Sequence, residues 1–142
     1  MQRTIAGADR IEIALAYGSD GLAGERVGPR GEEAWSLRSP WKVMSPGQAA
    51  ALRGILLERK SWQTERKACT FSPNVAFRWF ADSDTAGALL CHGCDELIGW
   101  QGSARMSGEV DPVADSLLSL TSAAFPNDSF LQAIVARKHL RY

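Results

Sequence analysis

The feature that most constrains this chain is a series of short apolar runs between residues 74 and 100, separated by residues that favour turns. In residues 74–81 every second side chain is large and apolar, which is the period of a half-buried strand. The polar run DSDTAG follows, and residues 87–91 and 96–100 supply two further apolar runs. The pattern predicts a central hairpin that extends into a three-stranded meander.

The rest of the chain adds a strand and about three helices. Residues 11–17 alternate as a strand does, and Ser-Pro-Gly-Gln at 45–48 has the spacing of a capping box that opens a helix. Asp-Pro at 111–112 repeats the start signal, and residues 129–140 carry an amphipathic helical pattern. We therefore expect a single α+β domain over residues 1–142, with a mostly antiparallel sheet.

Two segments are expected to form loops. Residues 18–34 contain five glycines and a proline, a density that disfavours regular structure. No Gly-Lys-Ser/Thr follows these glycines, so they do not form a phosphate-binding loop of the P-loop type. We expect this Gly-rich loop to be a loose β-hairpin or a mobile loop, and its length indicates that it is either mobile or shaped for a partner. We expect residues 103–110 to be a second loop.

The charge balance gives no attraction to nucleic acid or to an anionic membrane, because 16 basic and 16 acidic residues cancel. No apolar run is long enough to span a membrane, and the N-terminal residues lack a signal-peptide pattern. Three cysteines are an odd number, and reduced thiols in a cytoplasm fit best. Basic residues gather at 53–67 and acidic residues at 82–128, an asymmetry that could pair across a homodimer interface.

The candidate metal ligands are Cys69, Cys91, His92 and Cys94. The sequence Cys-His-Gly-Cys at 91–94 is a C-x-x-C motif at the end of a predicted strand. If the hairpin forms as expected, residue 74 lies near residue 94, and Cys69 can approach the pair. A structural zinc needs four ligands, so one of His92, Asp95 and His139 would have to complete the set.

Two other interpretations of the cysteines compete with zinc. A C-x-x-C pair can exchange disulfides when its first thiol lies at a helix N-terminus. The acids and glycines after Cys94 make a helix there unfavourable. The third interpretation needs no chemistry, since free cysteines often pack in cores as small apolar side chains.

The cysteine motifs also carry a resemblance to a known group. The chain has Cys69-Thr-Phe71-Ser-Pro73, then an apolar strand with Arg78, then Leu90-Cys91-x-x-Cys94-Asp95-x-Leu97, and later Ala124-Phe125-Pro126-x-Asp128. These elements resemble a group of small uncharacterised bacterial proteins over roughly residues 45–130. His92-Gly93 differs from the aromatic-then-small pair of that group. The resemblance implies that the cysteines belong together as a set, and it implies no reaction.

No catalytic motif is present, and a pocket near Trp79, Trp100 and Asp95 would be an enzymatic interpretation without a supporting pattern. We expect a non-catalytic binding or interaction module without a cofactor, with a protein or small-molecule partner. Its surface would be the Gly-rich loop and the face near the Cys-His-Gly-Cys turn. The alternative is a thiol-centred site, structural zinc or redox, built on Cys69, Cys91 and Cys94.

Overall fold

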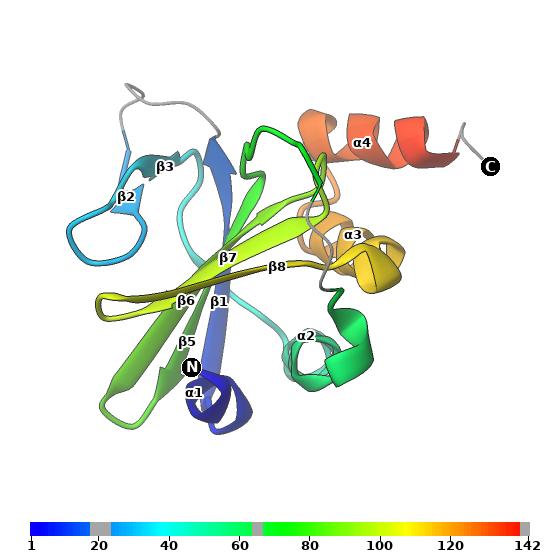
Figure 1. Cartoon of the computed structure of the whole chain (residues 1–142). Helices are drawn as coiled ribbons and strands as arrows, with labels where there is room; N and C mark the ends of the chain where they lie inside the picture. Colours follow the sequence, from blue (N-terminus) through cyan, green and yellow to red (C-terminus); the bar gives the residue numbers. More distant parts are fainter. Residues whose placement is uncertain (18–23, 64–66, 140–142) are drawn as a thin grey trace.

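One continuous antiparallel sheet organises the structure, a computed structural model that describes residues 1–17, 24–63 and 67–139 (Figure 1). The strands lie in the order β2-β3-β1-β5-β6-β7-β8, and β4 also pairs with β1. The strands are β1 (Arg10–Tyr17), β2 (Arg26–Val27), β3 (Trp35–Leu37), β4 (Lys42–Val43), β5 (Val75–Ala81), β6 (Asp84–Cys91), β7 (Glu96–Gln101) and β8 (Ala104–Glu109). The predicted α+β class with a mostly antiparallel sheet is confirmed.

The predicted meander is confirmed as β5, β6 and β7, and its register is fixed by the pairs Val75–Leu90 and Leu90–Leu97. The first turn is shorter than expected, because Ala81 pairs with Asp84 and only two residues connect them. Asp82 makes this tight turn with a φ of 52°, a conformation that Asp tolerates better than most residues. The rest of the polar run DSDTAG therefore belongs to β6.

The prediction of a loop at residues 103–110 is wrong, since β8 occupies most of that segment. Most of its side chains are exposed, because β8 is the outer strand beside β7. An exposed edge strand does not need the alternation of apolar residues by which buried strands are recognised.

Four α-helices accompany the sheet in the described residues: α1 (Gln2–Ala6), α2 (Pro46–Leu57), α3 (Ala114–Ala124) and α4 (Ser129–His139). Short 3₁₀ turns at η1 (Arg59–Ser61) and η2 (Asp111–Val113) follow α2 and precede α3. The predicted cap of α2 is present, since the Ser45 hydroxyl accepts a hydrogen bond from the Gln48 N–H at 3.2 Å. Asp111 does not cap α3 as expected, because the 3₁₀ turn intervenes.

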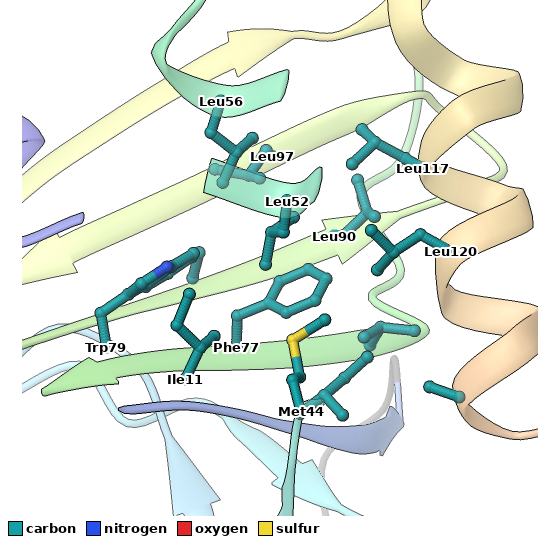
Figure 2. Packing of buried hydrophobic residues seen from close by; sticks show 14 of the residues in the cluster. Ile11, Met44, Leu52, Leu56, Phe77, Trp79, Leu90, Leu97, Leu117 and Leu120 are labelled. Atoms are coloured by element: carbon teal, nitrogen blue, oxygen red, sulfur yellow. The ribbon is translucent and has the colours of Figure 1, made fainter. Parts of the chain in front are cut away.

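The sheet buries both of its faces. Its inner face packs against the helices, and Figure 2 shows Phe77 and Trp79 of β5 beneath Leu52 of α2, with Leu117 of α3 nearby. The outer face carries smaller side chains, including Ala76, and is covered by β2, β3 and several aromatic residues. In Figure 1, α2, α3 and α4 lie on one side of the strands β1 and β5–β8, and the end of the sheet formed by β2 and β3 lies on the other side of these strands.

Part of the charge asymmetry is neutralised within the chain. Lys67 lies 2.7 Å from a carboxylate oxygen of Asp111 and 3.7 Å from one of Glu109. Arg53 donates hydrogen bonds to the carbonyls of Ile5 and Ala8, which fastens α1 to α2. These basic residues therefore have internal partners, and the homodimer stays a prediction.

A two-pronged ion pair joins the outer face to the last helix. The guanidinium of Arg38, just after β3, donates to both carboxylate oxygens of Asp128 at 2.5 and 2.8 Å. Asp128 also accepts a hydrogen bond from the Leu131 N–H at 3.0 Å and so caps the start of α4. The Arg38 hydrogen bond and this capping bond lower the pKa of Asp128.

We expect Asp128→Ala to lower the free energy of unfolding by about 3 kcal/mol, because it removes both the cap and the partner of a half-buried guanidinium. Asp128→Asn keeps a capping oxygen and should cost about 1–2 kcal/mol. Urea unfolding measures both values. Glu58→Gln is the control, because its contact with Lys60 is exposed and 3.9 Å long, and it should change stability by less than about 0.5 kcal/mol. Equal losses in the two Asp128 variants would show that the cap contributes nothing.

Candidate functional site

The Cys-His-Gly-Cys motif forms the turn between β6 and β7. Cys91 is the last residue of β6 and pairs with Glu96, so residues 92–95 make the turn. Asp95 closes it with a φ of 52°. Within the turn, the Cys94 N–H donates to the Cys91 sulfur at an N–S distance of 3.3 Å. The local fold thus holds the two cysteines of the motif against each other.

Cys69 reaches this turn as the sequence predicts, but it does so as a disulfide with Cys94. The chain is guided there by Asn74, whose N–H donates to the Leu90 carbonyl at 2.9 Å and continues the pairing of β5 with β6. The expectation of three reduced thiols therefore differs from the structure. Only Cys91 is a free thiol, and its residue is 2% exposed.

His92 faces the helical layer. Its Nε2 lies 2.8 Å from the Thr121 hydroxyl of α3, and its backbone N–H donates to the Asn74 side chain at 2.7 Å. The Thr121 hydroxyl itself donates to the Leu118 carbonyl, so it accepts from a protonated Nε2. Burial and, to a smaller extent, the positive charge of Lys138 lower the pKa of His92 to about 4. The ring is therefore neutral at pH 7 and anchors the turn to α3.

The described residues contain no group of three or more His, Cys, Asp or Glu side chains arranged to hold a metal ion. Two of the four candidate ligands, Cys69 and Cys94, are bonded to each other. Asp95, the other nearby candidate, pairs with Lys138 at 2.9 Å. The side chain of His139 lies outside the part of the chain that the structure describes. A zinc site on these residues stays a prediction, and it requires the disulfide to be reduced.

A cavity of about 340 Å³ lies beside the turn, and we call it the thiol cavity. Its lining includes Cys69, Cys91, Cys94, Phe130 and Arg137. Both partners of the disulfide and the free thiol thus border one space. Phe130 is 53% exposed and gives the cavity one apolar wall, whereas Arg137 and Lys138 add positive charge to the lining.

A second cavity of about 340 Å³, the outer cavity, lies between the Gly-rich loop and the outer face of the sheet. Trp41 and Trp100 line it together with Arg78 of β5 and Arg30 of the loop. The Arg78 guanidinium stacks on the Trp41 ring at 4.1 Å, and its Nε donates to Glu12. The predicted Gly-rich loop falls in part on residues 18–23, outside the described residues, and the rest of it contains the short strand β2, which pairs with β3. Several residues between 25 and 33 line this cavity.

The predicted enzymatic pocket near Trp79, Trp100 and Asp95 does not form. Trp79 is fully buried in the helix-facing core, whereas Trp100 packs with the cluster on the other face of the sheet. Residues 79 and 100 therefore lie on opposite sides of the sheet. The alternation in β5 predicts the face on which Arg78 lies, because adjacent side chains in a strand point to opposite faces and Arg78 must therefore face away from Trp79. No pattern in the sequence around Trp41 predicts that this residue lines the outer cavity.

A third cavity, of about 470 Å³, lies near α1 and the end of α2. Most of its lining is apolar: Met1, Ile5, Leu56, Leu57, Trp62, Leu97 and Met106. It gathers fewer charged groups than the outer cavity, and the sequence interpretation did not point to it.

No protein-family model, curated protein or solved structure matches this chain. Within the described residues, no helix has the length and apolar character that crossing a membrane requires.

Reduction of the disulfide tests its structural role. Cys69 and Cys94 are 25 residues apart, and a bond that closes a loop of this length stabilises a fold by about 3.5 kcal/mol in the chain-entropy model. We expect the double variant Cys69→Ser, Cys94→Ser to lose that amount in urea unfolding, and a reductant to lower the wild type to the same value. A reductant should leave the double variant unchanged. A loss below about 1 kcal/mol would contradict the bond's contribution.

The neutral, buried His92 predicts a loss of stability in mild acid. The unfolded ring takes up its proton near pH 6.5 and the folded ring only near pH 4, so the unfolded chain binds more protons between these values. The free energy of unfolding should have its full value above about pH 6.5. It should fall by about 2 kcal/mol from pH 7 to pH 5. Urea unfolding at the two pH values measures it. His92→Gln can still donate to Thr121 but does not titrate, and its stability should change little over the same range.

Proposed function

We propose that this protein is a non-catalytic binding module and that the outer cavity is its ligand site. The observation that supports the proposal is the placing of two tryptophans and a stacked arginine around one space of about 340 Å³. Volumes of this size hold small molecules, and aromatic walls with a few fixed polar groups are typical of such sites. The Gly-rich loop supplies one wall, which accounts for a loop that is otherwise long for a chain of this size.

The ligand class follows from Arg78. Its guanidinium is fixed on two sides, by the Trp41 ring against one face and by Glu12 at Nε. Among the described residues, the two terminal nitrogens of Arg78 have no hydrogen-bond partner, and 29% of the Arg78 side chain is exposed. These nitrogens are therefore accessible to a ligand. A guanidinium held in this way presents a planar pair of donors that matches a carboxylate or a phosphate.

The remaining charges of the outer cavity leave room for an anion. The lining holds three arginines against two glutamates, Glu25 and Glu33, so positive charges outnumber negative ones. Arg30 is exposed, and its guanidinium has no partner among the described residues. Trp100 offers a ring surface for stacking. We therefore propose a flat ligand that carries a carboxylate or a phosphate.

Matched pairs of ligands test this proposal. We expect indole-3-acetate to bind more tightly than indole-3-acetamide, or AMP more tightly than adenosine, by about tenfold, because only the anion can pair with both guanidinium groups. Isothermal titration calorimetry measures the affinities, and quenching of tryptophan fluorescence locates the ligand. Arg30→Gln should weaken binding of the anion and leave the neutral partner unchanged. Arg3→Gln, an exposed substitution in α1, is the control and should bind as the wild type does.

Equal affinity for the charged and neutral members of both pairs would contradict the role of the arginines. Failure of all four compounds to bind would contradict a site for flat small molecules. A protein partner on the Gly-rich loop would then be the remaining form of the binding module.

A second candidate function is the thiol-centred site, which the free Cys91 beside the Cys69–Cys94 bond favours. The redox state of the compartment decides between its two forms. In a cytoplasm, where we expect the chain to be, thiols stay reduced and Cys69, Cys91, Cys94 and His92 could take up zinc. In an oxidising compartment the disulfide persists. Elemental analysis of protein purified under reducing conditions separates these forms, since only the first retains stoichiometric zinc.

A further inference from the structure

The three cysteines differ sharply in their surroundings. Cys69 is exposed, in a segment (residues 67–74) that forms neither helix nor strand. Cys91 and Cys94 are each 2% exposed, at the buried end of the β6–β7 hairpin. Because the number of cysteines is odd, one thiol stays free whichever pair is bonded, and in this structure the free thiol is the buried one.

The buried Cys91 thiol lies against the backbone of Cys94. The Cys91 sulfur accepts the Cys94 N–H at 3.3 Å, which holds it against the backbone of the residue whose sulfur is in the disulfide. All three cysteines line the thiol cavity. The spacing Cys91-x-x-Cys94 is the spacing at which two cysteines in one turn can bond to each other.

We propose that these residues form a thiol–disulfide exchange site in which Cys91 is the nucleophile and Cys69 the leaving group. The Cys91 thiolate attacks the Cys94 sulfur, the bond between Cys94 and Cys69 breaks, and a Cys91–Cys94 bond forms. Cys69 leaves as a thiolate and takes up the proton that Cys91 gave up. One disulfide and one thiol are present before and after, so no external oxidant or reductant is needed.

The exchange changes what the molecule presents to solvent. In the first state the free thiol is buried at Cys91, and in the second it is at the exposed Cys69. The exchange also removes the covalent tie that holds residues 67–74 against the hairpin. The second state therefore offers a surface thiol, on a segment that no disulfide ties to the hairpin, to a disulfide or an electrophile in solution.

Alkylation of the native protein followed by tryptic mapping without reduction tests the proposal. Trypsin should release residues 68–78, with Cys69, and residues 79–105, with Cys91 and Cys94, because no other Lys or Arg lies between these limits. Before exchange the two peptides are joined by the disulfide. After exchange they separate, and the bond lies within residues 79–105. Incubation with iodoacetamide at pH 8 should place the label on Cys69 and yield the separate peptides.

The variants Cys91→Ser and Cys91→Ala remove the nucleophile and should keep the two peptides joined, with at least about tenfold less label on Cys69 than in the wild type. Circular dichroism checks that both variants fold. If one variant does not fold, the other still tests the proposal. The labelling rate should not depend on protein concentration, because the attack is intramolecular. Ligand binding at the outer cavity is read out separately, so either proposal can fail alone.

Three outcomes would overturn the proposal. The first is label on Cys91 with the peptides still joined, which would mean that the cavity opens without exchange. The second is no label on native protein over the time in which unfolded protein reacts fully. The third is equal labelling of Cys69 in the wild type and in a folded Cys91 variant.

Discussion

The alternation of side chains along β5 is the constraint on which the rest of the structure depends. Val75, Phe77 and Trp79 point into the helical layer, while Ala76 and Arg78 point to the outer face. A slip of one residue in its pairing with β1 or β6 would exchange these faces and bury a guanidinium among leucines. The register is therefore fixed by burial on both sides of the sheet. The register of β5 also determines where both candidate sites lie. Arg78 of β5 lines the outer cavity, and the cysteine turn follows β6, the strand that pairs with β5.

The two faces differ in side-chain size, and this difference creates the outer cavity. The inner face is filled by large apolar residues from the sheet and helices. The outer face carries Ala14, Ala76 and Gly87, and the Trp100 indole lies so close over Gly87 that a Cβ there would come within 2.5 Å of the ring. Small residues let the tryptophan lie flat on the sheet, and the short strands β2 and β3 cover only part of the remaining surface. A cavity lined by aromatic rings follows from packing large residues over small ones.

The sequence predicts well the features that depend on local periodicity and poorly those that depend on distant partners. The alternation of Phe77 and Trp79 and the Ser45 cap lead directly to β5 and α2. The edge strand β8 is missed because exposed residues need no alternation. The approach of Cys69 to the turn follows from the hairpin register, but its bonding state does not, since an odd set of thiols can pair in three ways. The stacking of Arg78 on Trp41 joins residues 37 positions apart across the outer face, and no local pattern encodes it.

The two ends of the disulfide differ in burial, and this difference determines what exchange at the thiol cavity would expose. The side of Cys94 is fixed by the β6–β7 pairing and by His92, whose ring is bonded to Thr121 and whose N–H is bonded to Asn74. The side of Cys69 belongs to a segment without helix or strand. A bond between a buried hairpin and an exposed residue can open with little disturbance of the core, because Cys94 is buried whereas Cys69 is exposed. With a free thiol already lying against Cys94, the buried side also contains a replacement partner. A buried cysteine that would otherwise only fill space thus gains a chemical role from the turn that holds it.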